Sequence, residues 1–116
     1  MKKTCALKQN KTFKYLYYRG GSEVSKTLVF YFKRNNKCTN RLGITVSKKV
    51  GKAVVRNRVK RLIRENYRLR EDNIRTGYDI VIVARILASE ADFWKIGRDF
   101  DYLLRKCGLS VENSGT

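Results

Sequence analysis

The chain has 116 residues, a length that fits one compact domain with its own core and leaves little room for a second. A hydrophobic fraction of 42% argues against a disordered chain, while 27 Lys and Arg against 10 Asp and Glu give a net charge of +17. Self-repulsion at this charge destabilises the free protein, so the composition predicts a polyanionic partner, with nucleic acid first and an anionic membrane surface second.

The cysteines and the termini indicate the compartment. Cys5, Cys38 and Cys107 are odd in number, widely spaced and without a CxxC pair, which favours free thiols in a reducing compartment over disulfides or a zinc site. The N-terminus lacks the apolar stretch of a signal peptide, and no run of about 18 apolar residues is present to span a membrane. We therefore expect a cytoplasmic protein with one RNA-binding domain, residues 1–107, and a disordered tail at 108–116.

The first predicted element is a helix over Lys11–Arg19. Asn10 is a suitable N-cap, and the pair Gly20 and Gly21 ends the helix. One face of this helix repeats at helical spacing and consists of Phe13, Leu16 and Tyr17.

Two strands are predicted next. Thr27–Lys33 is rich in β-branched and aromatic residues, and Arg41–Ser47 alternates apolar and polar side chains. The polar stretch at residues 34–40 suits a hairpin loop between them, and Ser22–Lys26 suits a further short strand.

The second half of the chain reads as helix, strand, helix. A helix is predicted over Ala53–Arg70, and Tyr78–Arg85 is a nearly continuous apolar run, typical of a strand buried on both faces. The last helix is expected to start near Ser89, where Ser89 and Asp92 approximate a capping box. Its apolar face consists of Phe93, Ile96, Phe100, Leu103 and Leu104. The order predicts an α/β sandwich with a small central sheet of about four strands and about three helices.

The helix predicted over Ala53–Arg70 has two contrasting sides. The apolar side, suited to packing on a sheet, contains Val55, Val59, Leu62, Ile63 and Leu69. The opposite side contains Arg56, Asn57, Lys60, Arg61, Arg64 and Arg68, with Arg58 at the boundary. Like charges at i, i+4 and i+8 destabilise an isolated helix by a few tenths of a kcal/mol per pair, and only Glu65 relieves them. Guanidinium groups match phosphate oxygens two at a time, so this side predicts a phosphate-binding surface rather than a merely soluble face.

The loop before this helix contains Ser47, Lys48, Lys49, Gly51 and Lys52. Free backbone N–H groups at the helix start would reinforce phosphate binding here, although Gly51 is equally explained as a turn residue.

Aromatic residues form a second group. Strand alternation puts Phe30 and Phe32 on one face and Tyr31 on the other. Both faces therefore carry aromatic residues, and the strand cannot have one plain core face and one plain solvent face. Each aromatic residue is by default part of the core, but Phe13, Tyr17 and Tyr31 together could line a groove in which single-stranded bases stack.

The sequence offers little catalytic machinery. It has no His, no Gly-rich nucleotide loop and no pair of acids in a shared setting. We expect a binding protein with no catalytic residue of its own and no metal site.

The stretch GITVSKKVGKAVVRNRVKRLIRE at residues 43–65 resembles the signature of the bacterial ribonuclease P protein component, with its Arg-Asn-Arg run at Arg56, Asn57 and Arg58. FKYLYYRG, LVFYF and YDIVIVAR also resemble the family's first helix, aromatic strand and last strand. The resemblance thus covers residues from about 10 to about 106.

The resemblance implies a protein subunit that joins a large catalytic RNA, ribonuclease P RNA, whose Mg²⁺-dependent hydrolysis removes the 5′ leader from precursor tRNA. It implies that the helix at residues 56–68 faces this RNA through Arg56, Asn57, Arg58, Lys60, Arg61, Arg64 and Arg68. It implies that a cleft between the first helix and the sheet takes the leader through Phe13, Tyr17, Tyr31, Ser47, Lys48 and Lys49. Tyr17 stands where many relatives have Phe, which keeps a stacking surface. Mg²⁺ would be bound mainly by the RNA, and neither a membrane nor a protein partner would be required. The family also implies a left-handed strand–helix–strand crossover, against the general rule.

Three rival interpretations fit parts of the pattern. A ribosomal or ribosome-assembly protein could use the same basic side on another structured RNA. A DNA-binding protein could place the helix in a major groove, but such helices project from their domains, whereas this one has a long apolar side. Peripheral membrane binding would need apolar residues that flank the basic face outward. A preference for precursor tRNA over mature tRNA separates the ribonuclease P interpretation from the others.

Overall fold

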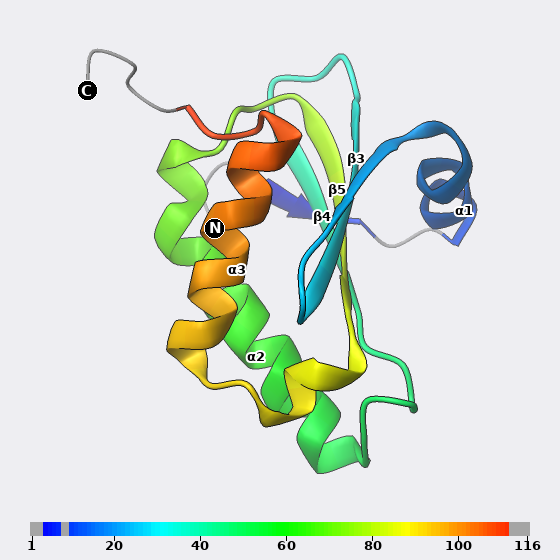
Figure 1. The fold of residues 1–116 in the computed structure, drawn as a ribbon. Helices are drawn as coiled ribbons and strands as arrows, with labels where there is room; N and C mark the ends of the chain where they lie inside the picture. The colour runs from blue at the N-terminus through cyan, green and yellow to red at the C-terminus, as the bar shows by residue number, and fades with distance from the viewer. Residues whose placement is uncertain (1–3, 8–9, 112–116) are drawn as a thin grey trace.

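The computed structural model describes residues 4–7 and 10–111 as a sheet covered by helices on both faces (Figure 1). The strands are β1 (Thr4–Ala6), β2 (Gly21–Val24), β3 (Leu28–Arg34), β4 (Asn40–Thr45) and β5 (Tyr78–Ala84). The helices are α1 (Asn10–Arg19), α2 (Ala53–Arg70) and α3 (Phe93–Cys107), with short 3₁₀ helices η1 (Glu71–Asn73) and η2 (Ile86–Glu90). The α2 range is the one that the sequence predicted.

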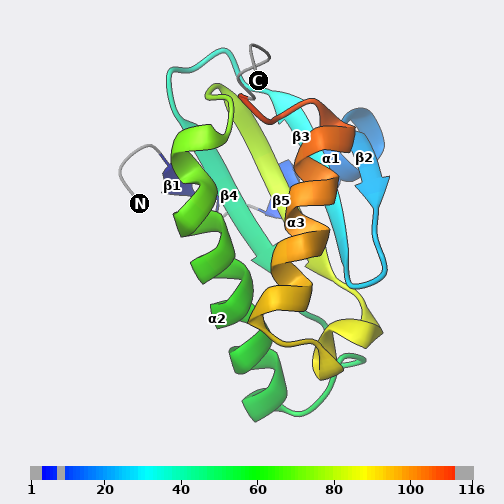
Figure 2. The same cartoon turned by 60° about the vertical axis from the view of Figure 1, so that its left-hand side comes forward.

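The sheet has five strands in the order β1-β4-β5-β3-β2. Helices α2 and α3 cover one face and α1 crosses the other (Figures 1 and 2). The α/β sandwich is confirmed, with one strand more than expected. The added strand, β1, has three residues and pairs in parallel with β4, too short a segment to give a periodic signal.

The predicted hairpin between β3 and β4 is wrong, because β5 lies between these strands and pairs with both. The reason lies in β5 itself. Its apolar residues Ile80, Val81 and Ile82 are fully buried, so the strand needs neighbours on both edges and cover on both faces. It therefore takes the centre of the sheet, and the polar stretch at residues 34–40 spans the gap above it.

Strands β4 and β5 are parallel neighbours joined through α2. In Figure 2, α2 lies in front of the sheet, both strands run downward, and β5 lies to the right of β4, which makes the connection left-handed. This is the hand that the family resemblance implied and the reverse of the usual preference.

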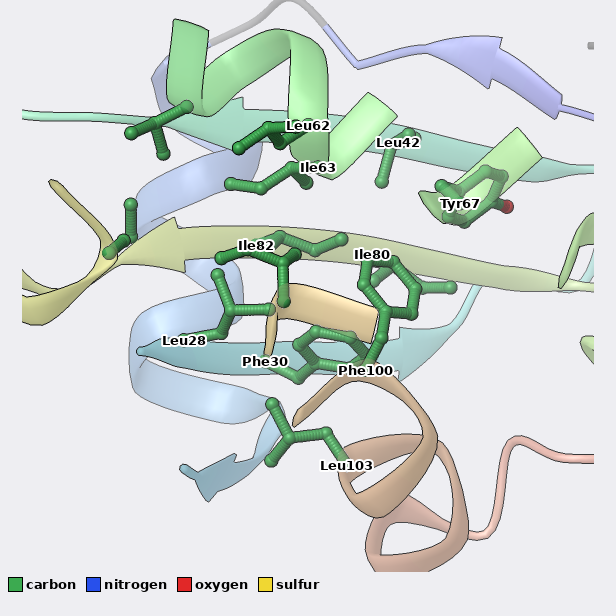
Figure 3. Packing of buried hydrophobic residues seen from close by; sticks show 14 of the residues in the cluster. Leu28, Phe30, Leu42, Leu62, Ile63, Tyr67, Ile80, Ile82, Phe100 and Leu103 are labelled. Atoms are coloured by element: carbon green, nitrogen blue, oxygen red, sulfur yellow. The ribbon is translucent and has the colours of Figure 1, made fainter. Parts of the chain in front are cut away.

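The main core lies between the sheet and the pair α2 and α3 (Figure 3). Phe30 of β3 packs edge-on against Phe100 of α3, with ring centroids 5.0 Å apart, and Ile63 of α2 is fully buried beside them. A smaller cluster of Leu7, Leu16 and Val81 fills the space under α1. Because α1 covers only part of its face, the rest of that face is available for binding.

The last helix begins at Phe93 rather than near Ser89. The Asp92 side chain caps it by accepting a hydrogen bond from the Lys95 N–H at 2.8 Å, whereas Ser89 lies in η2. Asp92 is therefore the cap, and the expected pairing of Ser89 with Asp92 does not form.

The expected disordered tail is wrong for its first residues. Gly108 adopts the left-handed conformation (φ 72°) that ends α3, and the Leu109 side chain is fully buried in the main core. Ser110 pairs with Ile74. A buried leucine anchors the segment, and residues 112–116 lie outside the described part of the chain.

Candidate RNA interface

The inward side of α2 holds the helix on the sheet. Val59, Leu62 and Ile63 are buried and Val55 is half-buried, as predicted. Leu69, expected on this side, is 59% exposed. Two residues that the sequence analysis missed replace it. They are Asn66, which donates to the Phe93 carbonyl at 3.3 Å, and Tyr67, whose hydroxyl meets the Thr4 hydroxyl at 2.8 Å.

The outward side of α2 is cationic. Asn57, Arg61, Arg64 and Arg68 are exposed, and Lys60 is half-buried at the margin. Among the described residues, none of the cations Lys60, Arg61, Arg64 and Arg68 has a hydrogen-bonding or ion-pair partner. We call Asn57, Lys60, Arg61, Arg64 and Arg68 the basic face. Unpartnered guanidinium groups on a rigid helix are suited to phosphate oxygens.

The other two predicted residues are placed differently. The Arg58 guanidinium turns toward the chain before α3 and donates to the carbonyls of Ser89 at 2.6 Å and Ala91 at 3.2 Å. Arg56 is half-buried, and its Nε is buried without a hydrogen-bond acceptor among the described residues. Arg58 thus acts as a structural clamp, an assignment that the sequence could not give because its partners lie more than 30 residues away.

The three predicted groove aromatics do gather on the α1 side of the sheet. The Tyr17 ring of α1 packs edge-on against Tyr31 of β3 with centroids 4.7 Å apart. The Phe13 ring lies directly over Gly43 of β4, where a β-carbon would come within 2.5 Å of Phe13 Cζ. Tyr17 is 41% exposed, while Phe13 and Tyr31 are half-buried.

Below these rings, the sheet remains partly open. Register places Val29, Val83 and Thr45 in one cross-strand row, next to the row of Tyr31, Val81 and Gly43. All three residues of the first row are half-buried. We call this row, together with Phe13, Tyr17 and Tyr31, the aromatic groove.

Ser47, Lys48 and Lys49 form the exposed turn after β4, closed by a hydrogen bond from the Val50 N–H to the Ser47 carbonyl at 3.0 Å. The turn begins two residues beyond Thr45, at the end of the aromatic groove. Ser47 and Lys49 also line a separate hollow with Lys26, an exposed cation that the sequence analysis missed. The structure thus brings the aromatics together and sets the basic turn at their margin.

The basic face and the aromatic groove meet at the edge of the sheet. β1 pairs with Asn40–Leu42, and no other strand among the described residues pairs with the rest of this β4 edge. There, a hollow of about 240 Å³ is lined by Phe13 from α1, Ile44 from β4, and Lys60 and Arg64 from α2. The two surfaces are therefore continuous around one edge.

Two buried acidic residues, Asp79 and Asp99, serve the fold. Asp79 accepts two hydrogen bonds from Arg41 at 2.7 and 2.6 Å, and this pairing raises the pKa of the Arg41 guanidinium. Asp99 accepts hydrogen bonds from the Thr27 hydroxyl and N–H. Among residues 4–7 and 10–111, no three His, Cys, Asp or Glu side chains gather closely enough to hold a metal ion. In the same part of the chain, no helix has the length and apolar character needed to cross a membrane.

Comparison with known proteins gives a consistent result. The family model described as Ribonuclease P matches residues 1–108. A ribonuclease P protein component of Clostridium botulinum (strain Langeland) is 46% identical over 104 residues, which cover 89% of this chain and 94% of that protein. The component from Caldanaerobacter subterraneus is 44% identical over 110 residues, 95% of each chain.

The fold agrees as well. The Staphylococcus aureus RNase P protein superposes with a TM-score of 0.83 at 34% identity, over 90% of this chain and 96% of that one. The Thermotoga maritima RNase P protein gives a TM-score of 0.78 at 34% identity, over 86% and 96% of the two chains. A family of protein components implies a partnership with ribonuclease P RNA and a role in tRNA processing. From its sequence and its fold, this chain belongs to the ribonuclease P protein component family.

Proposed function

We propose that this protein binds the catalytic RNA of ribonuclease P through the basic face and the 5′ leader of precursor tRNA through the aromatic groove, and so promotes endonucleolytic removal of the leader. The observation that supports this division is the placement of the two surfaces. The basic face lies on one side of the sheet and the groove on the other, and they join at the hollow lined by Phe13, Lys60 and Arg64. One RNA–protein assembly can therefore contact both at once.

The basic face suits a large folded RNA. Its cations project from a helix whose opposite side is buried, so little backbone freedom is lost on binding. Each phosphate contact releases counterions, so the affinity falls steeply as salt rises. Arg58 contributes by holding the η2 segment and the chain before α3 in place rather than as a free cation.

The aromatic groove suits a single strand. Tyr17 and Tyr31 expose ring surface beside Phe13, and stacking on such rings tolerates any base at about 1 to 3 kcal/mol per base. Lys48 and Lys49 lie at the end of the groove, where they could meet the leader phosphates. A paired stem would not expose base faces to these rings, which favours an unpaired leader over mature tRNA.

The hydrolysis itself belongs to the RNA subunit and its bound Mg²⁺, and this chain acts in the cytoplasm by positioning RNA, without a further protein subunit. The test is cleavage of a precursor tRNA by ribonuclease P RNA from a clostridial relative at low Mg²⁺, with and without the protein. We expect a strong gain that needs a 5′ leader and falls with salt. Tight RNA binding without any gain in cleavage would instead favour a ribosome-assembly role.

A further inference from the structure

The single tryptophan of the chain, Trp94, lies outside every surface described so far. It stands in the first turn of α3 and is 74% exposed, the largest exposure of any aromatic residue of α3. Burial of a Trp side chain stabilises a protein more than burial of almost any other residue, so an exposed Trp often marks a contact surface.

Trp94 forms one wall of a hollow of about 620 Å³ between α2 and α3. Its ring packs edge-on against Phe93 with centroids 5.1 Å apart, and Leu69, 59% exposed on α2, lies on the other side. Figure 2 shows α2 and α3 side by side in front of the sheet, on the face opposite α1. The hollow therefore belongs to the same side of the molecule as the basic face.

The floor of this hollow is rigid. At Gly97 a β-carbon would come within 2.9 Å of Asn66 Oδ1 and 3.0 Å of Arg70 Nη2, so the side chains of α2 pack closely against α3 at this glycine. Arg70 donates to Asp101 at 2.6 Å and to Asn66 Oδ1 at 2.8 Å. The Arg58 clamp fixes the chain just before Trp94. The hollow is thus preformed, which lowers the entropic cost of binding.

The charges around the hollow favour an anionic partner. Asp101 is neutralised by Arg70, while Arg98 is exposed and has no ion-pair partner among the described residues. Leu69 lines the hollow and Arg68 precedes it in the chain, so the hollow and the basic face share the C-terminal turns of α2. An aromatic wall beside free guanidinium groups suits a nucleobase with its phosphate, since stacking and cation–phosphate contact are both available.

We propose that the hollow lined by Trp94, Phe93 and Leu69 receives an unpaired nucleobase of the ribonuclease P RNA, stacked on the Trp94 indole, with Arg98 on the adjacent phosphate. The inference rests on the proposed function, because it extends the basic face by one base-stacking contact. The leader is not the occupant, since its groove lies on the opposite side of the sheet.

The test uses the fluorescence of Trp94, which no other tryptophan obscures. The full chain is titrated with ribonuclease P RNA from a clostridial relative and, separately, with a single-stranded leader oligonucleotide. Free N-acetyltryptophanamide corrects for absorption by the RNA. We expect the RNA subunit to quench the emission strongly at saturation and the leader oligonucleotide to leave it unchanged.

Variants extend the test to affinity. Loss of one stacked base lowers affinity by about 5-fold to 150-fold, so Trp94→Ala should weaken RNA-subunit binding in this range and Trp94→Phe should weaken it less. Tyr102→Ala, an exposed aromatic of α3 outside the hollow, is the matched control and should bind like the parent. Arg98→Ala should weaken binding and reduce its salt dependence by about one phosphate contact.

Several results would overturn the proposal. Unchanged emission with a saturating RNA subunit, or full affinity of Trp94→Ala, excludes the contact while leaving the proposed function intact. A blue shift without quenching indicates burial against an apolar protein surface. Sedimentation of the free protein reveals a second copy as the occupant if Trp94→Ala abolishes self-association. Absence of any RNA-subunit binding by the parent chain would refute the proposed function itself.

Discussion

Phe13 and Gly43 fit together across the gap between α1 and the sheet: the tip of the phenyl ring occupies the space where any other residue would place its β-carbon. The distance from that β-carbon to Phe13 Cζ would be 2.5 Å. Gly43 is buried in a regular strand and has no unusual backbone conformation. Glycine is needed here because it has no side chain to collide with the Phe13 ring. The tip of the ring can therefore come close to the β4 backbone, where Phe13 forms part of the wall of the aromatic groove.

The first prediction follows from this contact. Gly43→Ala should push the Phe13 ring outward and weaken leader binding, while the protein remains folded because the ring end can move. If the ring is lost as a stacking surface, affinity falls by about 5-fold or more. Leader affinity and thermal unfolding of Gly43→Ala, Phe13→Leu and the double variant form a double-mutant cycle. Additive losses in the cycle would mean that Gly43 does not act through Phe13.

The pair of Tyr17 and Tyr31 leads to a second prediction. Tyr17→Ala and Tyr31→Ala should each weaken binding of a precursor tRNA with a leader, and the double variant should lose less than the sum because the rings touch. Tyr31→Phe keeps the ring and serves as the control. Affinity for mature tRNA and for the RNA subunit should stay unchanged in all of them. An equal loss on mature tRNA would argue against a leader groove.

Arg58 and Arg61 lie three positions apart on α2 but have different surroundings, which gives a third prediction. Arg58→Ala removes two hydrogen bonds from a charged group to backbone carbonyls, so the free energy of unfolding should fall by about 1.5 to 3 kcal/mol. Arg61→Ala, at an exposed position, should change stability by less than about 0.5 kcal/mol. Urea denaturation of both variants measures the difference. Equal free energies of unfolding for the two variants would show that the Arg58 clamp does not stabilise the fold.

The fourth prediction concerns charge on the basic face. Arg61→Glu with Arg64→Glu should sharply lower RNA-subunit affinity and reduce the slope of log affinity against log salt by about 2 or more. Lys37→Glu with Arg75→Glu, two exposed charge reversals outside α2, changes the net charge by the same amount and is the control. Filter binding across a salt series provides the measurement. If this control matches Arg61→Glu with Arg64→Glu, overall charge and not the basic face governs binding.

The cysteines give a fifth prediction. Burial raises the pKa of the Cys107 thiol to about 12, with the Glu23 carboxylate adding to the shift, whereas Cys5 and Cys38 are exposed. Because the thiolate is the reactive form, iodoacetamide at pH 8 should alkylate Cys107 far more slowly than the exposed pair. Peptide mass spectrometry over time resolves the three sites. Comparable rates in the native protein would show that the end of α3 opens readily.

Tyr67 makes the stability of the fold depend on alkaline pH, because burial raises the pKa of its hydroxyl above the ordinary value of 10.0. The Tyr67 hydroxyl therefore ionises more readily in the unfolded chain than in the folded protein. Its contribution to the free energy of unfolding is complete below pH 10.0 and is lost as the pH rises above that value.

Several features were readable from the sequence because they depend on local periodicity. The two sides of α2, the alternation of Phe30 and Tyr31, and the central character of β5 each follow from residue spacing along one element. The tertiary structure decided what spacing cannot encode, because the partners lie far apart in the chain. In the folded protein β5 lies between β3 and β4, and Arg58 donates to the Ser89 carbonyl. Leu69 lies outside the core and lines a hollow together with Trp94. Leu69 has the right period for burial, but Tyr67 already fills the core at the last turn of α2. Helical periodicity gives the direction of a side chain, and only the packed neighbours determine whether that direction leads to the core, to a backbone carbonyl or to an open hollow.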